Sequence, residues 1–300
     1  MTASSALAEA VANATGRSVL GARPTAGGSI NDAWTFELEG GERTFVKTRA
    51  DAARGEYATE AAGLRWLAEP GAIELPAVLA VGDDERGPRF LALEWIEEGA
   101  LDGPGAEALG RGLAALHATG APAFGASPPG APGGGFAPLR IGPLSLPNDP
   151  AAEWPEFYVR SRLRPLVALA AERGALSAPG REAVERVCER IGDLAGPPEP
   201  PARLHGDLWG GNVLAGRDGR ARLIDPAAYG GHREVDLAML RLFGAPSPRV
   251  FAAYEEAAPL ADGHEDRVAL WQLFPLLVHA VLFGGHYGHS VEQAARRYAG

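Results

Sequence analysis

Residues 204–214, LHGDLWGGNVL, constrain this chain more than any other stretch. Asp207 and Asn212 lie five residues apart in it, and Asp225 follows thirteen residues after the asparagine. Phosphoryl transfer from a magnesium nucleotide needs a carboxylate that takes the proton of the attacking hydroxyl. It also needs an amide and a second carboxylate that hold the metal on the phosphates. The order of these three side chains therefore predicts a phosphotransferase site.

Chain length and net charge limit the classes of protein to which this sequence can belong. The 300 residues, 46% hydrophobic and 22% charged, suffice for one large domain or for two lobes with a sizeable core. The formal net charge of −10 argues against a nucleic-acid duplex or an anionic membrane as partner. A single cysteine, Cys188, excludes an internal disulfide, and its helical surroundings predict a buried thiol.

Two stretches bear on the cellular location. Residues 1–16 lack the basic region and apolar core that are typical of a secretory signal. Residues 270–283 are the most apolar stretch, but Gln272, Pro275 and His279 interrupt it, which predicts a buried helix and not a membrane span. We therefore expect a cytoplasmic protein.

The N-terminal part predicts a nucleotide site. Residues 33–38 and 43–48 alternate like the strands of a hairpin, and Lys47 lies in the second strand. Thirteen residues later, Glu60 lies in a helical run over residues 57–67. A strand lysine held by a helix glutamate and aimed at the phosphates is the arrangement of kinase-type sites. Glu56, one helical turn earlier on the same face, is the alternative partner.

Residues 89–96 predict a further strand that ends abruptly in acidic residues. In a two-lobed kinase-like fold, residues 94–98 would form the hinge between the lobes, and backbone groups there would contact the adenine edge. Residues 121–150, rich in proline and glycine, predict a loop or mobile insertion over the site.

The interval after Asp225 bears on the acceptor. Only residues 226–234 separate this carboxylate from the start of a helix at residue 235. A protein kinase places a long activation segment there to dock a polypeptide. The short interval disfavours a protein kinase and predicts a small acceptor.

Taken together, these stretches resemble the fructosamine kinase (ketosamine-3-kinase) family, in the aminoglycoside-phosphotransferase branch of the protein-kinase-like fold. The continuation of HGD into LWGGN, together with REVDLA at 233–238, carries the resemblance to ketosamine kinases. The resemblance spans roughly residues 17–290. The other matching motifs are GGSIND at 27–32, FVK at 45–47, EAAGL at 60–64, LEW at 93–95, WPEFYVRSRLR at 154–164, DP at 225–226, FGG at 283–285 and Tyr287.

The resemblance implies a bilobal α+β protein-kinase-like fold. Residues 1–96 would form a small N-lobe with an antiparallel sheet and one main helix. Residues 97–300 would form a larger, mostly helical C-lobe that holds the catalytic loop and the acceptor-binding helices.

It also implies an ATP- and Mg²⁺-dependent kinase for the sugar 3-hydroxyl of a ketosamine, whose phosphorylated product decomposes and frees the amine. Asp207 would be the catalytic base, and Asn212 and Asp225 would bind magnesium. The nucleotide would be held by Gly27, Gly28, Ser29, Ile30, Lys47, Glu60, Glu94, Trp95 and Ile96. Trp209, His232 and His286 are candidates to line the acceptor site.

Two alternatives stay open at this point. The acceptor could be another small alcohol, such as an aminoglycoside or choline; a polycationic aminoglycoside would call for an acidic pocket. The chain could instead be a non-catalytic nucleotide-binding protein, although intact Lys47, Asp207, Asn212 and Asp225 argue against this.

Overall fold

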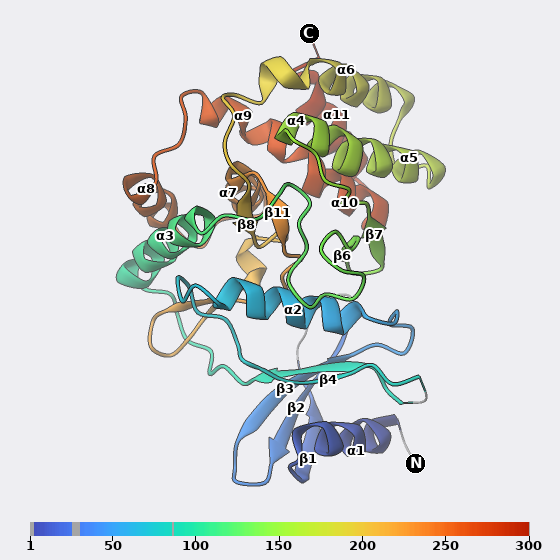
Figure 1. Cartoon of the computed structure of the whole chain (residues 1–300), viewed down its shortest axis with the longest axis vertical. Coiled ribbons are helices and arrows are strands. Elements are labelled where there is room, and N and C mark those ends of the chain that lie inside the picture. The colour runs from blue at the N-terminus through green and yellow to red at the C-terminus, as the bar shows by residue number, and fades with distance from the viewer. Residues whose placement is uncertain (1–2, 26–30, 86, 300) are drawn as a thin grey trace.

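Alternating strands and two helices build the smaller lobe. The computed structural model describes residues 3–25, 31–85 and 87–299. Five antiparallel strands pair in the order β1-β2-β3-β5-β4. They are β1 (Val19–Pro24), β2 (Asp32–Leu38), β3 (Arg43–Thr48), β4 (Val78–Gly82) and β5 (Phe90–Glu94). Helices α1 (Ala3–Thr15) and α2 (Glu56–Ala68) cover its two faces, and α2 lies between the sheet and the larger lobe (Figure 1).

The two faces of the sheet are packed separately. Leu7 and Val11 of α1 bury against Phe36 on one face. On the other face, Leu64 of α2 buries against Leu91. Because neighbouring strand residues point to opposite faces, this double burial fixes the register of β3, which carries Lys47 towards the larger lobe.

The larger lobe is mostly helical (Figure 1). Its helices are α3 (Gly103–Ala118), α4 (Trp154–Tyr158), a π-helical turn (Val159–Leu163), α5 (Arg164–Glu172), α6 (Ala178–Leu194), a 3₁₀ turn (Gly210–Asn212), α7 (Arg233–Leu242), α8 (Pro248–Ala257), α9 (His264–Trp271), α10 (Leu273–Phe283) and α11 (Tyr287–Arg296). Short antiparallel pairs join them: β6 (Leu139–Ile141) with β7 (Leu144–Leu146), β8 (Ala202–Leu204) with β11 (Tyr229–Gly231), and β9 (Val213–Ala215) with β10 (Ala221–Leu223). Its main core surrounds the buried Tyr158 and Trp271.

The apolar stretch predicted as a buried helix lies in this core. Residues His264–Phe283 are long and apolar enough to cross a membrane, yet 67% of the most apolar window is buried within the protein. Such burial is typical of a core helix. The free thiol of Cys188 is also buried, as the sequence predicts.

The proline- and glycine-rich residues 121–150 are more structured than a plain loop. They contain the β6–β7 hairpin, and the side chains of Ser127 and Asn148 are buried. Both side chains donate hydrogen bonds to the carbonyl of Ala137, at 2.9 and 2.7 Å. The buried side chains of this segment are part of the C-lobe packing. Its mobility stays a prediction.

Hydrogen bonds and ring contacts join the lobes. The Leu223 N–H donates to the carbonyl of Glu74 at 3.0 Å. Arg203 of β8 stacks 4.7 Å from the ring of Trp66 and donates to its carbonyl at 2.6 Å. The boundary predicted between residues 96 and 97 follows β5 and stays a prediction.

Candidate active site

A cavity of about 530 Å³ lies between the lobes. It brings together five residues that the sequence predicts for phosphoryl transfer, two from the N-lobe and three from the C-lobe. These are Lys47, Glu60, Asp207, Asn212 and Asp225. Residues that are far apart in the sequence therefore line one cleft of the size that binds small ligands.

The loop after β8 places Asp207 at this cavity. Gly206 has a left-handed φ of 81°, and an added Cβ would collide with the carbonyl oxygen of Ala227. Only glycine fits both conditions. The buried carboxylate of Asp236 accepts the N–H groups of His205 and Gly206 at 2.7 and 2.9 Å. Asp236, at the start of α7, therefore holds the loop in place.

Asn212 and Asp207 are held against each other. The Asn212 amide nitrogen donates to the Asp207 carbonyl at 2.8 Å and to its Oδ2 at 3.1 Å. Burial raises the pKa of Asp207 to about 7, against the hydrogen bond from Asn212, which lowers it. Because its nitrogen is used in this way, Asn212 presents its amide oxygen as the remaining acceptor.

Lys47 is almost completely buried and links the two lobes. Its Nζ lies 2.5 Å from Oε1 of Glu60 on α2 and 3.0 Å from Oδ1 of Asp225 after β10. Burial lowers the pKa of Lys47, but the charges of Asp225 and Glu60 outweigh it and leave the pKa raised, so the lysine stays charged. Glu56 pairs instead with Arg49, at 2.9 Å.

Asp225 has an unusual backbone. Its φ is 55°, and among the described residues no other non-glycine residue has a positive φ. Aspartate tolerates this left-handed region better than most residues, though at a cost. The conformation accompanies the contact between the Asp225 carboxylate and Lys47.

The remaining predicted nucleotide residues are placed differently. Gly27, Gly28, Ser29 and Ile30 lie outside the described residues. Glu94 ends β5, its N–H donates to the carbonyl of Ala77 at 2.8 Å, and Trp95 stacks under Arg43 at 5.0 Å. Neither these two residues nor Ile96 is among the described residues that line the cavity. Their contact with adenine stays a prediction.

Aromatic side chains form the other end of the cavity. Trp209, predicted for the acceptor, lines it and is 38% exposed. Its ring meets Phe243 edge-on with 6.1 Å between centroids, and Phe243 lies 4.6 Å from His279. Phe283 and Tyr287 complete the group. No motif in the sequence points to Phe243 or His279 as lining residues; the available signal is a histidine within the apolar residues 270–283.

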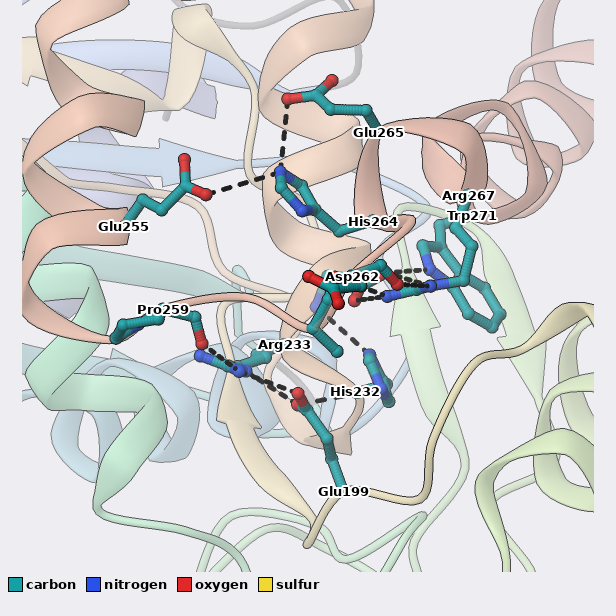
Figure 2. Close-up of polar contacts among 12 residues, drawn as sticks. Glu199, His232, Arg233, Glu255, Pro259, Asp262, His264, Glu265, Arg267 and Trp271 are labelled. Atoms are coloured by element: carbon teal, nitrogen blue, oxygen red, sulfur yellow. Dashed lines mark hydrogen bonds and ion pairs between the residues drawn. The ribbon is translucent and has the colours of Figure 1, made fainter.

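The prediction that His232 lines the acceptor site is wrong. His232 is buried, caps α7 by accepting the N–H of Glu234 at 3.3 Å, and stacks on Trp271 with 5.5 Å between centroids (Figure 2). It is absent from the described lining of the cavity. Burial lowers the pKa of His232, which favours the neutral ring that this cap requires. Histidine suits position 232 because its Nδ1 can accept the N–H at the start of α7.

His286 is also not among the described lining residues. Its exposed ring lies 4.3 Å from that of Tyr287, which does line the cavity. A role for His286 at the acceptor site stays a prediction.

Glu199, His232 and Glu234 bring three potential metal ligands within 4.8 Å of one another. Both carboxylates are already paired: Glu199 with Arg233 at 2.7 Å (Figure 2), and Glu234 with Arg267 at 2.6 Å. With two cations adjacent, a further cation would meet repulsion. We assign this cluster a structural role.

A cleft of this composition between a sheet lobe and a helical lobe belongs to the kinase class of ATP-dependent phosphotransferases. Comparison with known proteins narrows the class. The chain belongs to the fructosamine kinase family, whose model matches residues 3–299.

Relatives cover nearly the whole chain. A "Probable ketoamine kinase" of Enterococcus faecium is 32% identical over 277 residues, 92% of this chain and 94% of the relative. One of Thermus thermophilus is 36% identical over 266 residues, 89% of each chain. The crystal structure of a candidate fructosamine-3-kinase from Thermobifida fusca superposes with a TM-score of 0.87 at 43% identity, covering 97% of this chain and 98% of its own. An aminoglycoside phosphotransferase shares the fold, with a TM-score of 0.65 at 17% identity, covering 99% of this chain and 100% of its own.

Proposed function

We propose that the enzyme transfers the γ-phosphate of ATP, with Mg²⁺, to the 3-hydroxyl of a ketosamine, which leads to deglycation. Membership in the fructosamine kinase family supports the acceptor class. One observation carries the chemistry: Asp207, Asn212, Asp225 and the Lys47–Glu60 pair line a single cavity.

Each side chain has a distinct role in this proposal. Asp207 orients the acceptor hydroxyl and accepts its proton as the phosphate is transferred. Its burial and its bond from Asn212 fix the carboxylate before the substrate binds. Lys47 carries a permanent charge for the phosphates, and Glu60 holds it in position. The site thus works mainly by positioning and charge neutralisation.

The donor set suits magnesium. Asn212 and Asp225 offer an amide oxygen and a carboxylate at the same cavity, and Mg²⁺ prefers such hard oxygen ligands. The ion would neutralise charge on the phosphates when it is bound. We assign Asn212 and Asp225 as its protein ligands.

The charges around the cavity favour a ketosamine over a polycationic aminoglycoside. The acidic side chains among its described lining residues are Glu56, Glu60, Asp207 and Asp225. Two of them come from α2 and two from residues 207–225, and three of the four contact a cation. The end formed by residues 127–148 and 243–287 offers no carboxylate among the lining residues that the structure describes. An aminoglycoside would need acidic groups there.

The test is turnover on a small panel of acceptors. Purified protein with Mg²⁺ and ATP is given ribulosyl-lysine, fructosyl-lysine, kanamycin or choline, and ADP release is followed. We expect turnover on the ketosamines. We also expect Asp207→Asn to lower kcat by about 10²–10⁴-fold while ATP still binds, because the variant loses the proton acceptor.

Three results would contradict the proposal. Turnover on kanamycin or choline alone would keep the mechanism and replace the acceptor. Binding of ATP without turnover on any acceptor would favour a nucleotide-binding protein. Near-normal turnover of Asp207→Asn would remove Asp207 as the base.

A further inference from the structure

Arg140 is the second cationic side chain at the cavity. It lies in β6, half-buried, and it lines the cavity together with Lys47. The two cations differ in their surroundings: Lys47 contacts two carboxylates. The side chain of Arg140 makes no hydrogen bond, ion pair or ring contact with any residue in the described part of the chain. As far as the described residues go, its guanidinium group is therefore available to a ligand.

The hairpin holds this arginine at a defined place. Arg140 pairs with Ser145 across the β6–β7 register, and its neighbours Leu139 and Ile141 are buried. Residue 140 is therefore fixed between two side chains that anchor the strand. A partly desolvated guanidinium with five donors and no acceptor binds carboxylate or phosphate oxygens preferentially, often through two parallel hydrogen bonds.

The rest of this wall offers no competing anion. The described lining residues from 127–148 and 243–287 contribute Arg140 together with aromatic, aliphatic and uncharged polar side chains, but no carboxylate. On the N-lobe side of the cavity the arrangement differs, because the lining residue Glu56 is paired with Arg49, at 2.9 Å. An anionic ligand would form with Arg140 the kind of ion pair that Glu56 forms with Arg49.

We propose that Arg140 binds an anionic oxygen group of the acceptor. The preferred substrates are then small ketosamines that carry a carboxylate on the amine or a phosphate on the sugar, ahead of uncharged adducts. This inference rests on the proposed function, whose acceptor it specifies. A cavity of about 530 Å³ accommodates a molecule of this size.

Three matched acceptors test the inference and separate the two anions. They are ribulosyl-glycine, ribulosyl-glycinamide, and the 5-phosphate of ribulosyl-glycinamide. We expect wild type to show a kcat/KM about 10- to 100-fold higher for the acceptor with the recognised anion than for ribulosyl-glycinamide, the range for a hydrogen bond between charged groups. A preference for ribulosyl-glycine assigns the anion to the amine carrier, and a preference for the 5-phosphate assigns it to the sugar.

Variants tie the preference to the side chain. The ratio of interest is kcat/KM for the preferred anionic acceptor divided by kcat/KM for ribulosyl-glycinamide. Arg140→Gln should bring this ratio close to one. Arg140→Lys should leave an intermediate ratio, because lysine keeps the charge but cannot form two parallel hydrogen bonds. Arg164→Gln is the matched control: it removes the same charge from an exposed arginine that pairs with Glu185 at 2.5 Å, outside the cavity lining. Its ratio should equal that of wild type.

Three outcomes would overturn the inference. Equal kcat/KM for all three acceptors in wild type would remove anion recognition while leaving the ketosamine kinase intact. A rise in the KM for ATP in Arg140→Gln as large as the loss on the anionic acceptor would place Arg140 on the nucleotide. Absence of turnover on every ketosamine would overturn the proposed function and this inference together.

Discussion

Glu56 and Glu60 lie one turn apart on α2, and the sequence leaves either as the partner of Lys47. Their contacts differ. Glu60 lies 2.5 Å from the lysine, whereas Glu56 binds Arg49 at 2.9 Å and accepts the Ala53 N–H at 3.0 Å, near the start of the helix. The first contact joins two residues that line the cavity, and the second stabilises the beginning of α2.

These contacts predict different effects of the same substitution. Glu60→Gln should lower kcat/KM for ATP by about 10-fold or more, because Lys47 loses a charged hydrogen-bond partner and turns to Asp225 alone. Glu56→Gln, the matched control on the same helix, should change the nucleotide kinetics less. Steady-state kinetics with varied ATP measures both. An equal loss in the two variants would refute the assignment of Glu60.

Asp236 braces the backbone just before Asp207. Asp236→Ala would leave the buried N–H groups of His205 and Gly206 without their acceptor. We expect the free energy of unfolding to fall by about 2–5 kcal/mol, measured by urea denaturation. Asp218→Ala, on the exposed turn between β9 and β10, should behave like wild type. Equal stability of Asp236→Ala and wild type would contradict the bracing role.

The same carboxylate predicts a dependence on pH. Burial would raise the pKa of Asp236, but His117 and the Gly206 N–H outweigh it and hold this pKa below its ordinary value of 3.8. A lowered pKa in the folded state stabilises the protein above the unfolded pKa, and this contribution is lost as pH falls through the folded pKa. The stability difference between wild type and Asp236→Ala should therefore be full at neutral pH and shrink below about pH 4. A constant difference in urea denaturation across this range would contradict the linkage.

At the scale of elements, a buried arginine ties residues 121–150 to the helical core. Arg162 is completely buried in the π-helical turn Val159–Leu163. It donates to the carbonyl of Pro147 at 2.8 Å and to Oδ1 of Asn148 at 2.6 Å. The rings of Phe157 and Tyr229 lie 4.6 and 4.3 Å from the guanidinium carbon and surround its charge. Asn148 lines the cavity, so this bond links core and site.

Arg162→Met tests that link. Methionine fills much of the same space but cannot donate to Pro147 and Asn148. We expect hydrogen exchange of residues 126–148 to accelerate about 100-fold or more, because two charged hydrogen bonds are lost and each stabilises by roughly 1.5–3 kcal/mol. The KM for the acceptor should rise while the KM for ATP stays close to wild type. Arg164→Met, exposed on α5, is the control; equal exchange in both variants would show that Arg162 does not anchor the segment.

At the scale of the molecule, ligands that touch both lobes should stabilise the whole fold. ATP with Mg²⁺ at about 100 times its Kd should add roughly 2.7 kcal/mol to the free energy of unfolding. The Tm should then rise by roughly 5 °C, measured by circular dichroism. EDTA should reduce the shift if Asn212 and Asp225 bind the ion as proposed. Lys47→Ala should reduce it too; an undiminished shift in that variant would separate Lys47 from the nucleotide.

The sequence predicts this molecule best where chemistry depends on local spacing. Asp207, Asn212 and Asp225 meet in one cavity because a short loop and hairpin connect them, and Lys47 and Glu60 follow from one strand and the next helix. The acceptor end depends instead on contacts between distant segments. Residues 127–148 meet 243–287 only through the packing of the C-lobe, which no local pattern records, and so His279 was missed. His232 was misplaced because a capping histidine has no spacing signature of its own.

Lys47 belongs to one lobe and holds a carboxylate from each. Because Glu60 comes from the N-lobe helix α2 and Asp225 from the C-lobe segment after β10, this single side chain couples the positions of the two lobes. We expect a phosphate that binds Lys47 to compete with Asp225 for the ammonium group. Nucleotide binding would then exchange one anionic partner of the lysine for another, and its net contribution to affinity would be smaller than that of a newly formed contact.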